Sequence, residues 1–380
     1  MVPSGWELRE LKDLTAIYDG THSTPKYVEY GVPFYSVEHL TKGDFSKTKF
    51  ISEEVFDKEN KRVKLERDDI LMTRIGDIGT AVHLDWNVRA SFYVSLALLK
   101  ASSHFDSSFM TQYINSSEFH RELWKRIIHV AFPKKINLGE IGKCHVLLPP
   151  MPEQRKIAKI LSTWDKAIST TERLIDNSKQ QKKALMQQLL TGKKRLLDDS
   201  GKPFEGEWLF STFSEVFKVA NNKKTQIKSG DYLESGNIPI VDQGKQLISG
   251  YTNNVEKYDD IPVIIFGDHT RIVKWVDFEF AQGADGTQVL KATKRFDTKF
   301  TYYLLSNTDI PNLGYSRHMR ELKEKDFKHP NSIKEQQKIA LVLTNADNEI
   351  GLLEQQLADL KQEKKALMQQ LLTGKRRVKI

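Results

Sequence analysis

The feature that most constrains this chain is a stretch of twelve residues that occurs twice. Residues 182–193 and residues 364–375 both read KKALMQQLLTGK, at an offset of 182 in a chain of 380 residues. The match extends upstream at the same offset, where Glu153-Gln154 corresponds to Glu335-Gln336. Because an identity of this length is not a chance event, one structural unit is predicted to be used twice.

Each copy closes a long helical pattern. Apolar residues recur at alternating steps of four and three from Ile157 to Leu189 and from Ile339 to Leu371, which is coiled-coil spacing. Each seam covers 33 residues, about 50 Å at the rise of an α-helix. Gly192 and Gly374 stand where a glycine C-cap belongs. We expect the two helices to bury their seams against each other. Four polar seam residues are expected to fix the register: Thr171, Ser178, Lys182 and Lys364.

Two further segments, 1–150 and 200–332, resemble each other more faintly. At an offset of 191, Leu99-Lys100-Ala101 corresponds to Leu290-Lys291-Ala292, and Gly76-Asp77 corresponds to Gly267-Asp268. Both segments alternate short β-rich runs with turns and then carry a helix, expected near 107–127 and 298–307. The β-rich runs are 32–37, 69–75, 80–85 and 92–99 in the first segment and 238–241, 261–266, 271–276 and 287–291 in the second.

These patterns predict an α+β fold. Two globular mixed α/β domains are separated by two long antiparallel coiled-coil helices, in a pseudo-twofold tandem repeat. The expected boundaries are 1–150 and 200–332 for the globular domains and 151–199 and 333–380 for the helices. A coiled coil that only holds a homodimer together is the alternative, but duplication within one chain argues against it.

Composition narrows the class of protein. Lys and Arg outnumber Asp and Glu by 58 to 50, a net charge of +8 that hints at a polyanionic partner. Seven of the eight excess charges lie in 153–199 and 335–380, so the near-neutral globules must gather basic groups on one face to meet a polyanion. The start of the chain has no signal pattern and no apolar run is long enough for a membrane helix, so we expect a cytoplasmic protein. One cysteine, Cys144, excludes an internal disulfide and a multi-cysteine zinc site.

Catalytic motifs are missing from the sequence. The chain has no P-loop, no Gly-x-Gly-x-x-Gly after a strand, no His-Glu-x-x-His and no Asn/Asp-Pro-Pro-aromatic motif of amino-methyltransferases. Asp-Thr-Lys at 297–299 and Glu-Leu-Lys at 321–323 lack the upstream Pro-Asp of a nuclease. The sequence therefore predicts a binding scaffold rather than an enzyme, with no catalytic residue, metal or cofactor of its own.

The duplicated helix also carries a family resemblance. A proline-rich entrance, then Glu-Gln-x-x-Ile-Ala, then a long helix that ends in the repeated stretch resembles the specificity (S) subunits of type I restriction–modification systems. The second globule adds 241–245 (VDQGK), 264–271 (IIFGDHTR) and 283–286 (GADG), which look like target-recognition-domain sequence. One departure is the second helix entrance, where Lys334 replaces the Pro152 of the first.

The resemblance implies a division of labour. Two target recognition domains each read one half of a split double-stranded DNA sequence, and two conserved spacer helices set the gap. The helices dock two modification subunits, which supply adenine-N6 methylation and its S-adenosylmethionine, and restriction subunits add translocation and cleavage driven by ATP and Mg²⁺. Two alternatives stay open at this point: a stand-alone DNA nuclease with its own recognition domain, and a structural coiled-coil adaptor.

Base readout in the major groove needs polar and basic side chains on loops. Candidates in the first globule are Thr21, His22, Ser23, Thr24, Arg74, Arg89, Lys134, Lys135 and Asn137. Candidates in the second are Gln243, Lys245, His269, Thr270, Arg271, Lys274, Gln282, Arg317, His318 and Arg320. Lys135 and Arg317 stand 182 apart, so both globules place a basic turn before the long helix. About half of the group is expected to touch DNA, more often phosphate than base.

The repeated stretch is the candidate partner surface. Identity over twelve positions exceeds what a helix seam needs, which favours a shared contact with the modification subunit. The residues expected to face outward are Met186, Gln187, Gln188, Met368, Gln369 and Gln370. The alternative is that these residues only flank the seam.

Overall fold

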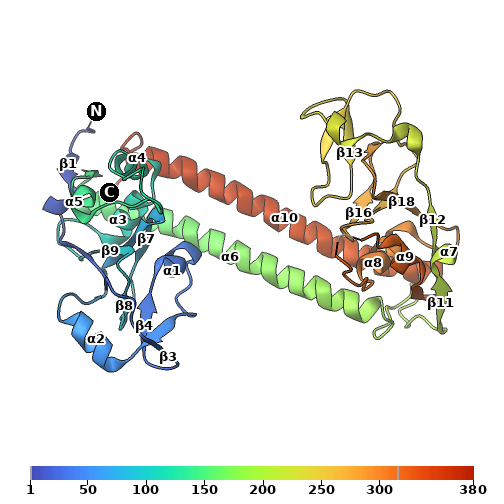
Figure 1. Ribbon diagram of the computed structural model, residues 1–380, viewed down its shortest axis with the longest axis horizontal. Helices are drawn as coiled ribbons and strands as arrows, with labels where there is room; N and C mark the ends of the chain where they lie inside the picture. Colours follow the sequence, from blue (N-terminus) through green and yellow to red (C-terminus); the bar gives the residue numbers. More distant parts are fainter. Residues whose placement is uncertain (1, 315) are drawn as a thin grey trace. The chain divides into compact units, whose positions relative to one another are not determined.

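The computed structural model describes residues 2–314 and 316–380, which form two compact units. Unit 1 comprises Met1–Glu172 and Gln355–Ile380, and unit 2 comprises Arg173–Glu354. Each unit holds one globule and a part of each long helix, and both chain termini belong to unit 1 (Figure 1). Because the repeated stretches fall in different units, each unit is described by itself.

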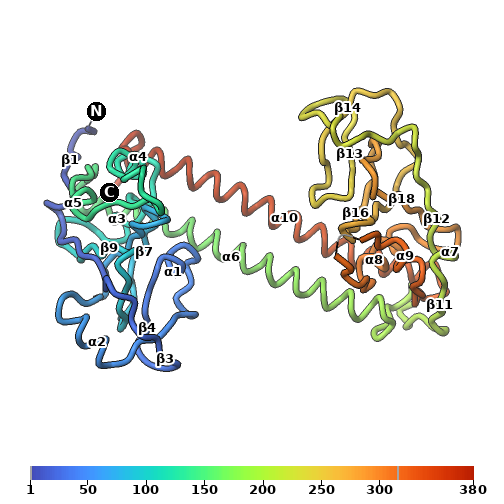
Figure 2. The backbone as a smooth tube through the Cα atoms, viewed as in Figure 1, coloured from blue at the N-terminus to red at the C-terminus, as the bar shows by residue number. Residues whose placement is uncertain are grey.

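The two predicted long helices are confirmed. Helices α6 (Met151–Leu189) and α10 (Ile333–Leu371) have 39 residues each, about 58 Å at 1.5 Å per residue, and their course can be followed in Figure 2. Every predicted seam residue is buried or half-buried. The glycines that follow, Gly192 and Gly374, have φ of +72° and +67°, which glycine adopts without the strain of a side chain.

Ion pairs between the helices show that the packed segments are antiparallel. As the residue number rises along α6, the number of its partner on α10 or in the segment after it falls. The pairs of unit 1 are Glu153–Arg377 at 2.7 Å, Asp165–Lys364 at 2.5 Å and Glu172–Lys361 at 2.8 Å. The pairs of unit 2 are Lys179–Glu354 at 2.7 Å, Lys182–Asp347 and Arg195–Glu335 at 2.6 Å. Each pair of unit 1 has an equivalent in unit 2: adding 182 to the number of the acid and subtracting 182 from the number of the base gives the pair in unit 2. The tandem repeat is therefore a repeat of contacts as well as of sequence.

The globule of unit 1 has three small sheets. Strands run in the order β2-β9-β6-β7 in one sheet, β3-β5-β4-β8 in another, and β1 pairs with β10. The bounds are β1 (Glu7–Glu10), β2 (Ile17–Asp19), β3 (Tyr27–Val28), β4 (Val32–Tyr35), β5 (Lys49–Ile51), β6 (Ile70–Ile75), β7 (Asp77–His83), β8 (Ser91–Phe92), β9 (Leu96–Leu99) and β10 (His145–Leu148). The helices are η1 (Leu11–Asp13), α1 (Val37–Lys42), α2 (Glu53–Asn60), α3 (Ser107–Ile114), α4 (Ser117–Trp124) and α5 (Leu138–Gly142).

The globule of unit 2 has a similar topology, with one strand fewer in its second sheet. Its sheets run β12-β18-β15-β16, β14-β13-β17 and β11-β19. The strands are β11 (Trp208–Thr212), β12 (Phe217–Val219), β13 (Ile238–Val241), β14 (Gly250–Thr252), β15 (Val263–Gly267), β16 (Val273–Val276), β17 (Ala281–Gln282), β18 (Thr287–Ala292) and β19 (Asp326–Pro330). The helices are α7 (Phe213–Val216), η2 (Lys223–Thr225), η3 (Ser229–Asp231), α8 (Thr298–Ser306) and α9 (Met319–Lys323). The predicted mixed α/β character of both globules is confirmed.

Two details of the sequence interpretation are wrong. The single helix expected near 107–127 is two helices, α3 and α4, because the Asn115 side chain bonds the backbone of Ala81 and Ser116 caps α4. The strand register also shows that Gly76-Asp77 and Gly267-Asp268 are not equivalent. Thr73 pairs with Leu96 in unit 1, and Gly267 pairs with Thr287 in unit 2. Leu96 and Thr287 are 191 residues apart and hold equivalent positions, so the residue equivalent to Gly267 is Thr73 and not Gly76.

Each globule packs on the start of one long helix and the end of the other. The core of unit 1 joins Ile157 and Leu161 of α6 to Leu371 of α10. The core of unit 2 joins Ile339 of α10 to Leu189 of α6. The helix ends are thus part of the two hydrophobic cores, which holds each globule on the helical pair by apolar burial.

Candidate nucleic-acid interface

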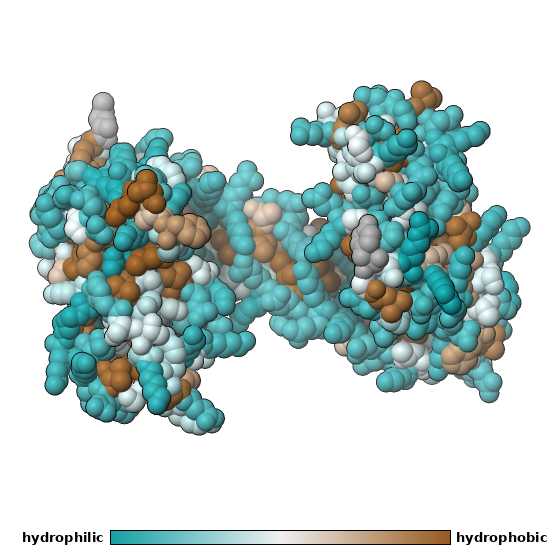
Figure 3. All heavy atoms as spheres, viewed as in Figure 1, coloured by the Kyte–Doolittle hydropathy of each residue, from teal (hydrophilic) through white to brown (hydrophobic). Residues whose placement is uncertain are grey.

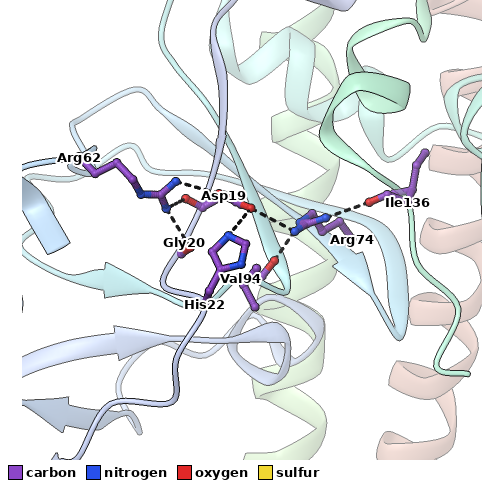
Figure 4. A network of polar contacts seen from close by, with 7 residues as sticks. All are labelled: Asp19, Gly20, His22, Arg62, Arg74, Val94 and Ile136. Carbon is purple, nitrogen blue, oxygen red and sulfur yellow. Dashed lines mark hydrogen bonds and ion pairs between the residues drawn. The ribbon is translucent and has the colours of Figure 1, made fainter.

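A buried arginine organises the candidate DNA-contact segments of unit 1. Arg74, at the end of β6, is 7% exposed. Its guanidinium donates to the Val94 carbonyl at 2.8 Å, to the Ile136 carbonyl at 3.1 Å and to Asp19 Oδ2 at 3.3 Å (Figure 4). Three segments that are distant in sequence are therefore fastened to one side chain.

Asp19 is the anionic centre of this network. Arg62 donates to Asp19 Oδ1 at 2.9 Å and to the Gly20 carbonyl at 2.8 Å, and His22 Nε2 lies 2.9 Å from Asp19 Oδ2 (Figure 4). Burial alone would raise the pKa of Asp19, but the hydrogen bond from Arg62 and the charges of His22, Arg62 and Arg74 outweigh it, so this pKa is lowered. Asp19 is therefore ionised at neutral pH and neutralises the buried Arg74.

Arg74 was a candidate DNA contact, and the structure places it in the interior instead. Each of its three guanidinium nitrogens already donates to a backbone carbonyl or to Asp19, and the side chain is buried, so it is not available to a base. Its place in the network makes it a positioning residue. The segments it holds at Asp19 and Ile136 lead directly into exposed candidates: His22, Ser23, Thr24, Lys134, Lys135 and Asn137.

Two other candidates of unit 1 differ from expectation. Thr21 is buried, and its hydroxyl has no hydrogen-bond partner among the described residues. Arg89 is exposed, but it pairs with Glu53 and its guanidinium lies 4.8 Å from the centre of the Phe56 ring. Thr21 is thus withdrawn from the surface, and Arg89 has protein partners with which DNA would have to compete.

Unit 2 places an acid where unit 1 places the buried arginine. The Asp268 amide donates to the Gly286 carbonyl at 2.7 Å, as the Arg74 amide donates to that of Ser95 at 2.9 Å. Ser95 and Gly286 are 191 apart, so Asp268 and Arg74 hold equivalent positions.

Asp268 fastens the equivalent turn by accepting hydrogen bonds. Its Oδ1 accepts from the Met319 amide at 2.7 Å, and its carbonyl accepts from the His318 amide at 2.8 Å. The carbonyl also lies 2.9 Å from His318 Nδ1, and this ring is fully buried. His318, another candidate DNA contact, is therefore part of the interior.

Two more candidates of unit 2 are buried polar residues with protein partners. Lys274 donates to the carbonyls of Asp242 and Gln246; burial lowers its pKa, while Asp242 opposes that shift. Gln282 accepts from the Asn222 amide at 3.1 Å and donates to the Thr287 carbonyl at 2.8 Å. Both residues hold strands and loops together and are corrected to structural roles.

The remaining candidates of unit 2 lie at or near the surface. Gln243 is half-buried and binds the backbone of His269 and Asp285. Arg271 has φ of +60° and donates to the Ile310 carbonyl at 2.8 Å. His269 is half-buried, with Nδ1 3.3 Å from the Ser316 carbonyl. The exposed members are Lys245, Thr270, Arg317 and Arg320.

The candidate partner surface divides into two kinds of residue. The four glutamines, Gln187, Gln188, Gln369 and Gln370, are exposed. Met186 and Met368, expected to face outward, are half-buried and pack on the cores of unit 2 and unit 1. Their long apolar side chains reach the core because each helix end is embedded in a globule.

Sequence reasoning missed the role of the duplicated Glu-Gln pair. Glu153 accepts from Arg377 Nε at 2.7 Å and from Trp6 Nε1 at 3.1 Å. Burial opposes ionisation, but the bonds from Arg377 and Trp6 outweigh it and the pKa of Glu153 is lowered. Glu335 is bound in the same way by Arg195, with Nε at 2.6 Å. The signal was present, because Arg195 and Arg377 stand 182 apart within the duplicated helix ends.

The glutamines of the pair fasten helix to globule. Gln154 accepts from the Asp106 amide at 2.8 Å and donates to the Pro149 carbonyl at 2.9 Å. Gln336 makes the equivalent bonds to the Asp297 amide, at 2.9 Å, and to the Pro330 carbonyl, at 3.1 Å. Since Asp106 and Asp297 cap α3 and α8, each glutamine joins the start of a long helix to the start of a helix in its globule.

Two searches of the described residues bear on other kinds of site. They contain no group of three or more His, Cys, Asp or Glu side chains that could hold a metal ion. No helix among them is long and apolar enough to cross a membrane. On the face shown in Figure 3, hydrophobic side chains form small groups among hydrophilic ones on both globules.

Comparison with known proteins identifies the family. The sequence pattern described as the type I restriction modification DNA specificity domain matches residues 3–178 and 205–362. The putative type I restriction enzyme MjaX specificity subunit of Methanocaldococcus jannaschii is 26% identical over 413 residues, covering 100% of this chain and 95% of that protein. The Escherichia coli type I restriction enzyme EcoR124I/EcoR124II specificity subunit is 34% identical over 122 residues, 31% of this chain and 30% of its own length.

A solved structure shares the fold. The S subunit of the type I restriction–modification system from M. genitalium superposes with a TM-score of 0.64 at 15% identity, covering 96% of both chains. The two-part family match and the full-length relative, rather than this structure, exclude the stand-alone nuclease and the structural adaptor. The chain belongs to the DNA specificity subunits of type I restriction–modification systems, which are non-catalytic subunits.

Proposed function

We propose that each globule of this chain reads one half of a split double-stranded DNA target while α6 and α10 set the gap between the halves. The observation that carries the proposal is the repeated topology. Two of the three sheets have matching strand orders in both globules, the third sheet has one strand fewer in unit 2, and each globule has its own exposed basic turn at Lys135 or Arg317. Two equivalent readers in one chain suit a target with two parts better than a continuous one.

The repeated helix ends support the docking of two copies of one partner. The same glutamines are exposed in both units, at 187–188 and 369–370, beside the same pattern of ion pairs. Two equivalent surfaces bind two copies of one protein. We take this protein to be the modification subunit, which supplies S-adenosylmethionine and adenine-N6 methylation. Restriction subunits would add cleavage driven by ATP and Mg²⁺, and the complex would act in the cytoplasm.

The test is a methylation map. The chain is co-expressed with the modification subunit of its own system, and methylated adenines are located by single-molecule sequencing. We expect one motif with two defined parts and a fixed unspecified gap. Replacing 200–332 by the matching segment of a relative should change one part and leave the other unchanged. A continuous motif, or changes in both parts, would contradict two independent readers.

The spacer role has its own test. Inserting one helical turn next to Thr191 should lengthen the unspecified gap and leave both defined parts as they were, because the readers are untouched. A second chain with four substitutions at exposed helix positions, and no change of length, is the control. An unchanged gap in the longer chain would contradict the proposal that the helices set the gap.

A further inference from the structure

A short hairpin in unit 1 exposes large apolar side chains at its tip. Ile128 and Lys135 pair as an antiparallel bridge and close the loop between them. Within the loop, Val130 is 96% exposed and Phe132 is 103% exposed, the two highest values for large hydrophobic side chains in the described parts of the chain. Lys134 and Lys135 at the base of the loop are candidate DNA contacts, whereas Val130 and Phe132 at its tip have no role in the proposed function.

The base of the hairpin is firmly held. The Ile128 amide donates to the Lys135 carbonyl at 2.8 Å, and the Gly76 amide donates to the Lys134 carbonyl at 2.9 Å. The next residue, Ile136, exchanges hydrogen bonds with Arg74. The exposed tip is therefore carried by the same framework that positions the other candidate DNA contacts.

The end of α4 supports one side of the loop. His129 Nε2 lies 3.0 Å from the Trp124 carbonyl, and the two rings are 4.6 Å apart. Lys134 Nζ lies 4.8 Å from the centre of the Trp124 ring, which is itself 55% exposed. Aromatic and cationic groups thus line the loop next to its apolar tip.

The charge around the tip is uniformly positive. The segment 123–137 contains four Lys or Arg residues and no Asp or Glu. Lys125 and Arg126 pair with Glu122, which lies just before the segment. Across residues 2–314 and 316–380, no carboxylate lies within ion-pair distance of Lys134 or Lys135. Two cations without a carboxylate partner among the described residues therefore follow the two exposed apolar side chains in the loop.

We propose that this hairpin is a wedge, in which Phe132 and Val130 enter a base-pair step while Lys134 and Lys135 contact the adjoining phosphates. Proteins that kink a duplex insert Phe, Leu, Ile, Met or Pro between base steps and neutralise phosphates with Lys and Arg. Insertion removes Phe132 from water and stacks it on a base, which offsets the cost of opening the step. A protein partner would be expected to match Lys134 and Lys135 with acids, whereas DNA presents phosphates along its whole length. The inference rests on the proposed function.

The hairpin that carries the wedge is a feature of unit 1. At the helix offset of 182, the position of Phe132 in unit 2 is Gly314, and in the described part of unit 2 no helix corresponds to α4, which supports the hairpin. We therefore assign the distortion of the duplex to the half-site read by unit 1.

The experiment uses the full chain in complex with its modification subunit and without S-adenosylmethionine. The duplex carries the motif found by the methylation map, with 2-aminopurine at single positions other than the methylated adenines. We expect raised fluorescence at one step within the half-site of unit 1. Phe132→Ala should abolish that signal and weaken binding by about tenfold or more, as loss of a base–aromatic stack does. Phe132→Leu should retain most of both, and Val255→Ala, an equally exposed apolar site in unit 2, should change neither.

Two results would overturn the wedge. If Phe132→Ala binds the duplex with unchanged affinity and fluorescence, the tip does not enter DNA, while the specific binding of the wild-type complex leaves the proposed function intact. If the variant no longer assembles with the modification subunit, the tip is a protein contact. A wild-type complex that does not prefer the motif would overturn the proposed function itself. Because Phe132 is fully exposed, the variants should keep the wild-type melting temperature.

Discussion

The two units solve the same structural problem with opposite charges. In unit 1 the side chain of Arg74 donates to the Ile136 carbonyl, just before α5, and in unit 2 the side chain of Asp268 accepts from the amide of Met319, the first residue of α9. Arg74 follows Thr73 of β6, and Asp268 follows Gly267, the equivalent residue of β15. The comparison shows that the repeat preserves the requirement to hold this turn and leaves the chemistry of the bond free to change.

The helix junctions differ from these centres, because both units use the same residue types there. Glu153 binds Arg377, and Glu335 binds Arg195. The remaining difference concerns the tryptophan that lies close to the glycine after each long helix, which is Trp6 beside Gly374 in unit 1 and Trp208 beside Gly192 in unit 2. Trp6 donates to Glu153, whereas Trp208 Nε1 is buried with no partner among the described residues. The junction of unit 2 thus has one buried N–H donor without a hydrogen bond, which lowers its free energy of unfolding relative to the junction of unit 1.

The largest expected difference between the two units comes from Arg74→Ala. Removing one partner of a buried pair costs about 3–5 kcal/mol. Here it also removes one of the donors to Asp19 and takes the side-chain donor away from the carbonyls of Val94 and Ile136. Hydrogen exchange should show the loss of protection in unit 1 only. Arg89→Ala, at an exposed arginine of the same unit, is the control and should change little. Equal loss of protection in unit 2 would contradict the independence of the two centres.

The matching change in unit 2 is Asp268→Ala. It leaves the buried Met319 amide without an acceptor, which costs about 1–3 kcal/mol. Asp268→Asn should cost less, because the amide oxygen can still accept from Met319. Denaturant unfolding of the three chains measures both effects. If Asn is as harmful as Ala, the negative charge matters and the hydrogen bond alone does not explain the position.

The interhelix lysines should have a smaller effect. Lys364→Met removes the pair with Asp165, and Lys182→Met removes the pair with Asp347. Their carboxylates are partly exposed, so each pair should contribute about 0.2–1 kcal/mol. Double-mutant cycles at low and high salt measure the coupling. Lys182 also lies 5.6 Å from the Tyr303 ring centre, so the cost in unit 2 should be the larger of the two. The reverse order would count against that ring contact.

The smallest effect concerns acid stability and unit 1 alone. Burial opposes ionisation of Glu122, but Lys125 and Arg126 outweigh it and lower its pKa to about 2. A pKa lowered by folding stabilises the unit above the ordinary value of 4.5, and this contribution is lost as the pH falls toward about 2. Glu122→Gln should therefore flatten the acid dependence of unit 1, by less than about 1 kcal/mol because Lys125 is exposed. Glu118→Gln is the control. A steeper acid dependence in the Glu122 variant would contradict the sign.

Much of the candidate site could not be predicted from the sequence. Residue type and loop position placed Arg74, Lys274, Gln282 and His318 among the DNA contacts, and each is buried with protein partners. Burial depends on segments far apart in the chain: Arg74 meets Ile136, which is 62 residues away. The offset between the globules also changes, from 191 at β9 and β18 to 194 at β6 and β15, so a fixed offset aligned the wrong Gly-Asp pair.

The sequence by itself determined the tandem repeat, the two long helices and the family, because heptad spacing and identity over twelve residues are local signals that need no knowledge of the folded chain. It also marked Lys182 and Lys364 as polar positions in the seam. Only the tertiary structure decided which basic side chains face outward, that Asp268 replaces Arg74, and that Met186 and Met368 belong to the cores. The physical reason is that hydrogen bonding and burial are settled by strand pairing and packing, which join residues that no pattern along the chain brings together.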